Sequence, residues 1–170
     1  MFLKRLMKAV LRASLVMLSS AALFWGSATY AEKLPHPLIV GPSADFITYA
    51  AFAKLESNVA EATLNVFLHA KASAEERKAI LADFDDDAGS IKLYSTQLEG
   101  QKLTGEAAEA LAQFKKDWTS FEKNAREAMY KGDNVTLKEL HEIYVTANKM
   151  DDAVDHALES LRDKMTRSAS

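Results

Sequence analysis

Apolar residues in the second half of the chain recur at alternating steps of three and four. This spacing puts them on one face of a helix and is typical of the core-facing seams of left-handed helical bundles. One row comprises Ala107, Leu111, Phe114, Trp118, Phe121, Ala125 and Ala128, and the other comprises Leu137, Leu140, Tyr144, Ala147, Asp151, Val154, Leu158, Leu161 and Met165. No strand-like alternation of apolar and polar residues competes with these rows. The sequence therefore predicts two long amphipathic helices here.

Two further helices are predicted upstream, and each carries a similar but weaker row. The first helix runs from about residue 44 to 70 with Ser43 as its N-cap, and the second begins with a capping box between Ser73 and Glu76. The first row comprises Phe46, Ala50, Ala53, Ser57, Ala60, Leu64 and Phe67, and the second comprises Ile80, Phe84, Asp87, Ile91, Tyr94 and Leu98.

The predicted lengths and connections indicate how the helices are arranged. The third helix should start after Thr104 and stop at Gly132, and the fourth should run from near Asn134 to about Lys164. Four helices of about equal length with short joints predict an all-α, up-down-up-down antiparallel four-helix bundle. We assign it to residues 43–167 and expect a disordered tail at 168–170.

The N-terminus has the layout of a secretory signal peptide. A basic opening with Lys4, Arg5, Lys8 and Arg12 precedes an apolar block and a short segment of small residues that ends at Ala31. We predict a signal peptide at 1–31, cleaved after Ala31, and export to the periplasm or the medium. A retained N-terminal membrane anchor is the alternative, because no charged residue separates Arg12 from Glu32. Residues 32–42 hold all three prolines and are predicted to be a linker.

Charge and cysteine content restrict the function. Removal of the signal peptide leaves 17 basic and 24 acidic residues, a net charge of −7. Such a surface disfavours nucleic acid and anionic lipid as partners, and we expect no stable membrane anchor after cleavage. The absence of cysteine excludes thiol catalysis, c-type haem attachment and iron–sulfur clusters.

Motifs for catalysis or metal binding are missing. The acidic run at 83–87 lacks the glycine and glutamate of a calcium loop, which would fall on Ala88 and Tyr94. None of His69, His141 and His156 follows a glutamate by three residues, as a dimetal bundle requires, and no G-x-S-x-G elbow is present. We expect no enzyme activity, no metal and no cofactor; a metal- or haem-carrying bundle is a less favoured alternative.

Polar residues interrupt the seams near the middle of all four predicted helices. By predicted height, Ser57, Asp87, Trp118 and Asp151 would form one layer, with Tyr144 close by. Buried carboxylates are costly unless paired, so this layer would suit a cation or an amine-bearing ligand stacked on Trp118. The alternative shifts each seam by one residue, which puts Ala88 and Met150 inside and both aspartates at the edge.

Two stretches in the second half of the chain carry a resemblance to a known family: the aromatic seam in LAQFKKDWTSFEKNAREAMYKGDN, residues 111–134, and LKELHEIYVTANKMDDAVDHALESL, residues 137–161. With these stretches the chain resembles the periplasmic four-helix-bundle sensor domains of methyl-accepting chemotaxis receptors. The resemblance implies small-molecule sensing, often by a symmetric homodimer. The receptors' second membrane span and cytoplasmic part have no counterpart in this sequence, so we expect a stand-alone relative and transfer no site residue from the family.

Two functions are consistent with these observations. The favoured one is a non-catalytic, sensor-like bundle that binds an unknown small molecule or protein. The alternative is a structural or chaperone-like helical protein that binds a partner. An enclosed pocket near Trp118 or Tyr144 would favour the first, and a solid core with an exposed apolar stripe would favour the second.

Overall fold

The computed structural model describes residues 43–168, and within them every regular element is helical. The four α-helices are α2 (Ala44–His69), α3 (Ala74–Glu99), α4 (Glu106–Lys131) and α5 (Leu137–Ser168), and a short 3₁₀ helix, η1 (Gly132–Asn134), precedes α5. For the described residues, the prediction of an all-α fold with four helices is thus confirmed. The predicted signal peptide, the proline-rich linker and residues 169–170 lie outside the described residues.

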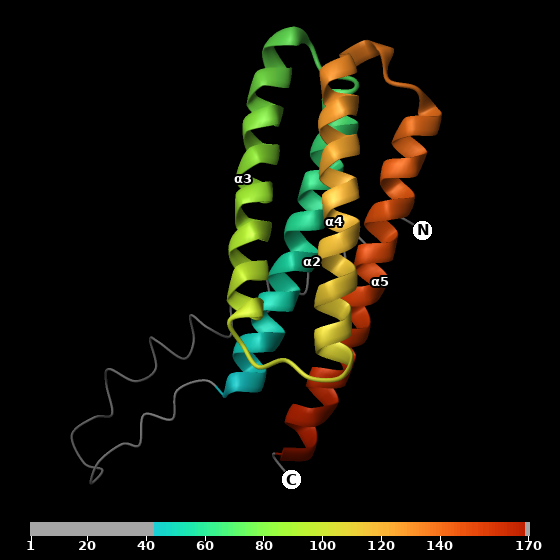
Figure 1. The fold of residues 1–170 in the computed structure, drawn as a ribbon. Helices are drawn as coiled ribbons and strands as arrows, with labels where there is room; N and C mark the ends of the chain where they lie inside the picture. The colour runs from blue at the N-terminus through green and yellow to red at the C-terminus, as the bar shows by residue number, and fades with distance from the viewer. Residues whose placement is uncertain (1–42, 169–170) are drawn as a thin grey trace, which may run out of the picture.

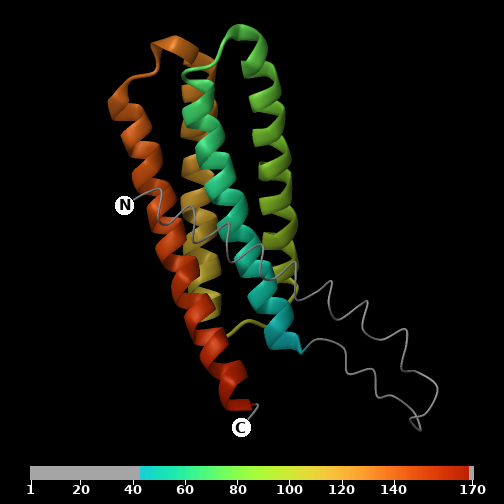
Figure 2. The same cartoon turned by 180° about the vertical axis from the view of Figure 1, so that it is seen from behind.

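The four helices lie side by side, and successive helices run in opposite directions (Figure 1). Helix α2 packs against both α3 and α5, and α4 packs against α5; the view from behind shows α2 between α3 and α5 (Figure 2). Helices α3 and α4 approach each other closely at few positions. Helix α3 therefore has α2 as its main neighbour.

The starts of the helices follow local capping rules. The Ser43 hydroxyl accepts a hydrogen bond from the Phe46 N–H at 3.2 Å, and both halves of the Ser73–Glu76 capping box are formed. The predicted start of the last helix near Asn134 is wrong, because residues 132–134 form η1. Thr136 caps α5 instead: Glu139 accepts from the Thr136 N–H at 2.8 Å, and Thr136 Oγ1 accepts from the Glu139 N–H at 3.3 Å. Helix α5 continues to Ser168, one residue beyond the predicted end of the bundle.

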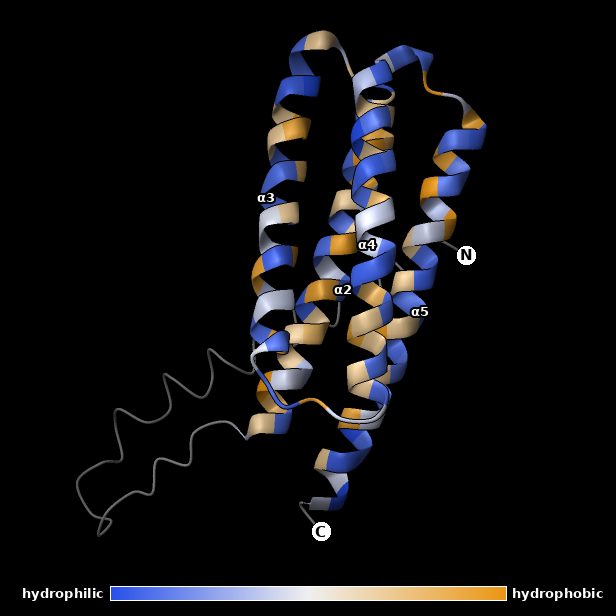
Figure 3. Ribbon diagram, in the orientation of Figure 1, coloured by the Kyte–Doolittle hydropathy of each residue, from blue (hydrophilic) through white to orange (hydrophobic). Residues whose placement is uncertain are grey.

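Ten of the sixteen residues in the rows predicted on the last two helices are buried in the core. Phe114 and Phe121 of α4 and Val154 of α5 are fully buried, whereas Leu137, at the start of the predicted α5 row, is 83% exposed. Hydrophobic and hydrophilic residues follow one another along the helices (Figure 3), and their separation onto opposite faces is stronger on α4 and α5 than on α2 and α3. The α4 and α5 rows thus indicate the correct buried face.

The row predicted on α2 has the wrong phase. Of its seven members only Ala53 and Ser57 are buried, and the core contribution of α2 comes instead from Phe52, Leu55, Val59, Ala62 and Val66. Helix α2 packs against two neighbours and is alanine-rich, so its apolar residues do not form a single narrow stripe.

Within residues 43–168, no helix combines the length and apolar character needed to cross a bilayer.

Candidate functional site

Two acidic residues of the described chain are buried, Glu56 of α2 and Asp87 of α3, and burial raises the pKa of the Asp87 carboxyl. Asp87 lies on α3 between the fully buried Phe84 and Ile91, on the face that packs toward α2, and is only 8% exposed. The Asn65 side-chain amide of α2 donates a hydrogen bond to Asp87 Oδ2 at 3.0 Å. An acidic residue thus occupies a core position of α3, as the row on this helix predicted.

A polar stripe on α2 leads to this carboxylate. Ser57, Glu61 and Asn65 are spaced by four residues and therefore lie along one side of α2. Ser57 is buried, and its hydroxyl donates to Glu61 Oε1 at 3.2 Å. We call these three residues with Asp87 the α2–α3 polar stripe.

The surroundings of Asp87 are acidic. Burial, together with the negative charges of Glu61, Asp83 and Asp86, raises the pKa of Asp87 to about 7, and the Asn65 hydrogen bond acts in the opposite direction. Among the described residues, no lysine or arginine forms an ion pair with Asp87. The site therefore holds excess negative charge at pH 8 and exchanges a proton near neutrality.

The remaining predicted site residues lie on α4 and α5, outside the α2–α3 polar stripe. Trp118 is partly buried and stacks on Phe121 with ring centroids 5.3 Å apart. The Tyr144 ring lies 6.4 Å from that of His141, and Asp151 is half-buried beside the fully buried Met150. On α3, Asp87 itself points into the core. On α5, Met150 points into the core and its neighbour Asp151 does so only in part.

Sequence reasoning missed Glu61 and Asn65. Both follow Ser57 at helical spacing, which was the available signal, but the predicted row continued through Ala60 and Leu64. The predicted height was also shifted. The partner of Asp87 is Asn65, eight residues after Ser57, or about 12 Å further along the α2 axis.

Open grooves occur elsewhere on the described surface. Two adjoining grooves between the start of α4 and the end of α5 share Glu106 and His156, and a third lies between α4 and α5 near Glu139. None of these three is lined by Trp118 or Tyr144. Over residues 43–168, no three histidine, aspartate or glutamate side chains are placed to hold a metal ion.

The chain was compared with protein-family models, with curated proteins and with solved structures, and no significant match was found. The resemblance to chemoreceptor sensor domains therefore stays a prediction. What the described residues offer chemically is a set of two carboxylates, those of Asp87 and Glu61, which accept hydrogen bonds from the Asn65 amide and the Ser57 hydroxyl, respectively. Such a set can bind a proton or a small cation that donates hydrogen bonds.

Proposed function

We propose that the chain is an exported up-down-up-down four-helix bundle that binds a small organic cation, non-catalytically, at the α2–α3 polar stripe. The observation that carries this proposal is the Asp87 carboxylate, buried among other acids without a cationic partner in the described part of the chain. An ammonium group placed there would neutralise the excess charge and donate hydrogen bonds to the carboxylates.

The energetics support a binding role for Asp87. A buried charge without a partner opposes folding, and a ligand cation that enters the site removes that cost. Groups that reduce stability in the free protein while serving a ligand are common at functional sites. Asn65 fixes the orientation of the carboxylate through its 3.0 Å hydrogen bond, so the acceptor is positioned before the ligand arrives.

The proposed response to the ligand is a change in helix packing. The site lies between α2 and α3, and α3 has few close approaches to α4, so α3 can adjust against α2 with little resistance from the other side. Asp87 is nearly covered in the free chain, so entry of a ligand requires this adjustment. A sensor-like signal would then consist of the altered position of α3.

The experiment is a thermal-shift screen of the purified protein at pH 8 with monoamines, diamines, polyamines and quaternary ammonium ions, followed by calorimetric titration of each positive compound. We expect at least one amine to raise the melting temperature of the wild type, and Asp87→Asn to abolish the shift. Glu159→Gln is the matched control, because this exposed acid lies on α5 and its loss changes the net charge equally.

Protonation provides a second measurement on the same site. Because the pKa of Asp87 is raised to about 7, we expect affinity for the cation to fall by up to about tenfold per unit below pH 7 in the wild type. A panel in which no amine shifts the wild-type melting temperature, or in which Asp87→Asn binds as well as the wild type, would refute the proposal.

A partner-binding function has one observation in its favour. Two large apolar side chains flank the α4–α5 connection and are strongly exposed, Tyr130 at 94% and Leu137 at 83%. The paired change Tyr130→Ser with Leu137→Ser should leave the melting temperature unchanged, since neither side chain is buried. If the chain binds a partner at the α4–α5 connection, footprinting in cell extracts should show this connection protected in the wild type and not in the double variant. Amine binding by the double variant should persist.

A further inference from the structure

A second row of residues at alternating steps of three and four runs along the outer face of α3. Its members are all exposed: Ala79, Ala82, Asp86, Gly89, Leu93 and Thr96. At about 100° per residue this row lies opposite the buried residues Phe84, Ile91 and Leu98. Helix α3 therefore carries one seam toward the core and another toward solvent.

Two features of the outer row are unfavourable for a helix whose outer face meets only water. Leu93 is 63% exposed, and Gly89 lies in the middle of the helix, where glycine is less favourable than alanine. A Cβ at Gly89 would meet no atom of residues 43–168 within 4 Å, so the packing of the described helices does not require glycine there. Leu93 lies one turn from Gly89, so the exposed leucine side chain stands next to the space left by the missing side chain of the glycine.

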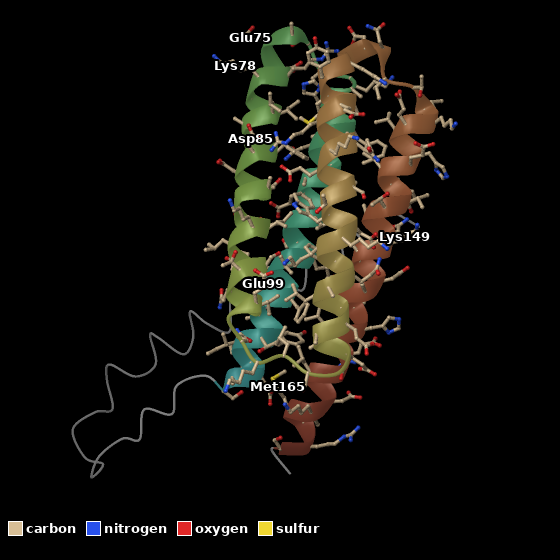
Figure 4. The ribbon with its side chains drawn as sticks, viewed as in Figure 1. Glu75, Lys78, Asp85, Glu99, Lys149 and Met165 are labelled. Atoms are coloured by element: carbon tan, nitrogen blue, oxygen red, sulfur yellow. The ribbon has the colours of Figure 1, made fainter. Side chains whose placement is uncertain are left out.

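The charges beside this row alternate in sign at a spacing of seven residues. Lys78, Asp85, Lys92 and Glu99 follow one edge of the row, and Figure 4 shows Lys78, Asp85 and Glu99 in this order along α3. The opposite edge carries Asp83, Ser90 and Gln97. Within the described residues Asp85 and Glu99 form ion pairs with Arg126 and Lys115 of α4, whereas Lys78 and Lys92 form none.

We propose that the outer face of α3 is the interface of a symmetric dimer in which the α3 helices of two copies pack antiparallel. The two-fold axis crosses α3 between Asp87 and Ala88. The numbers of two row residues that face each other across the interface therefore add up to 175. Leu93 then packs against Ala82 of the second copy, Asp86 against Gly89, and Thr96 against Ala79. Every larger side chain meets a small one, as knobs-into-holes packing requires.

The edge charges match in the same alignment. Lys78 faces Glu99 of the second copy and Asp85 faces Lys92, and the two-fold axis repeats both pairs. The other edge pairs Asp83 with Ser90 of the second copy and brings no like charges together. A parallel pairing would instead place Asp86 against Asp86 and Gly89 against Gly89, leaving a repulsion and a gap. The face is thus complementary to itself, which is why the partner is a second copy.

The position of α3 leaves this surface accessible. Although α2 and α3 have equal lengths of 26 residues, α3 buries five residues and α2 buries twelve. The dimer uses the face of α3 opposite to the buried Phe84, Ile91 and Leu98, so no residue of the α2–α3 polar stripe lies in the proposed interface.

Sedimentation velocity over a wide concentration range tests the dimer. We expect a reversible monomer–dimer equilibrium for the wild type, a loss of dimer for Leu93→Asp, and dissociation about tenfold more favourable for Lys92→Glu, which faces Asp85 of the second copy. Lys149→Glu on α5 (Figure 4) is the charge-matched control and should dimerise as the wild type does. Circular dichroism melting of each variant checks that the monomer remains folded.

A mixing experiment tests the alignment. Asp85→Lys and Lys92→Glu should each weaken the homodimer, because each substitution places like charges opposite one another. An equimolar mixture of the two variants should nevertheless form a heterodimer, because the lysine introduced in one copy then faces the glutamate introduced in the other, and the unchanged Lys92 and Asp85 face each other. A wild type that stays monomeric at millimolar concentration would overturn the proposal. So would a dimer that survives Leu93→Asp unchanged, or a mixture that shows no gain over its separate components.

Discussion

Asp87 is the residue at which stability and the proposed function conflict. An aspartate that is 8% exposed has to be either neutral or paired, and the described residues supply one amide donor and no cation. Its pKa is raised from 3.8 to about 7, so the folded chain binds a proton more tightly than the unfolded chain. This contribution to stability is fully present below pH 3.8 and is lost as the pH rises through 7.

Replacement of Asp87 by asparagine should therefore stabilise the chain at alkaline pH. A shift of one pKa unit corresponds to about 1.4 kcal/mol, and after allowance for solvent screening we expect Asp87→Asn to add about 2 kcal/mol at pH 8 and little at pH 4. Urea unfolding at several pH values measures this difference. Equal unfolding free energies of wild type and variant at pH 8 would contradict the assignment of Asp87 as an ionisable core residue.

His69 gives the opposite pH dependence. It is buried at the end of α2, and no described residue forms a hydrogen bond with its Nδ1. Burial, together with the nearby positive charge of Arg77, lowers the pKa of His69 below 6.5. Because the unfolded chain takes up the proton first, stability is lost as the pH falls below 6.5.

The histidine effect is best measured without the aspartate. In the Asp87→Asn background, we expect the urea midpoint to decrease between pH 7.5 and pH 5, and His69→Leu added to that background to reduce the decrease. A midpoint that declines equally with and without the histidine would assign the acid sensitivity to another group.

At the scale of the helix, features set by a few neighbouring residues could be predicted and those set by packing could not. The Ser43 cap and the Ser73–Glu76 box depend on residues three apart, and both form as expected. The phase of α2 depends on its two neighbours, so a row through Ala50 and Leu64 misidentified its buried face. Asn134 was a plausible cap by residue type, but η1 displaced the start of α5 to the competing Thr136–Glu139 pair.

The connections between helices contain two glycines with positive φ that differ in their surroundings. Gly105 has φ +57 and nothing within 4 Å of an added Cβ, whereas Gly132 has φ +55 and an added Cβ would lie 2.8 Å from Arg77 Nη1. Arg77 donates through Nε to the His69 carbonyl at 3.1 Å and pairs with Asp133, so it links the end of α2 to the α4–α5 connection.

Alanine at these two positions should separate backbone strain from the displacement of Arg77. Gly105→Ala should cost about 2 kcal/mol from the backbone alone, because φ +57 with ψ −139 is a conformation that essentially only glycine adopts. Gly132→Ala, at φ +55 and ψ −120, should cost about 1 kcal/mol more because Arg77 must also move. Chemical denaturation measures both free energies. If the two losses were equal, the guanidinium would contribute nothing to this corner. In an Arg77→Ala background we expect the two losses to converge.

At the scale of the whole molecule, the candidate site was only partly predictable because the relative heights of helices are not encoded locally. The inward position of Asp87 followed from its place in the α3 row, but its pairing with Asn65 depends on how far α3 is shifted along α2. The single layer expected from Ser57, Asp87, Trp118 and Asp151 assumed helices of equal length with aligned ends. Helix α5 is 32 residues long and the other three are 26, so that assumption fails.

Unequal packing predicts unequal stability among the helices. Helix α3 buries five residues and approaches α4 closely at few positions, whereas α2 lies between two neighbours and buries twelve. Local opening requires less free energy where fewer apolar contacts are broken, so amides of α3 should exchange before those of α2 and α5. We expect hydrogen exchange with mass spectrometry, at a concentration where the wild type is monomeric, to show this order.

At a concentration where dimer forms, or with a bound amine, the protection of α3 should rise toward that of α2. If the amides of α3 exchange as slowly as those of α2 in the dilute, ligand-free protein, the bundle opens as one cooperative unit. A ligand-driven adjustment of α3 alone would then have no structural basis.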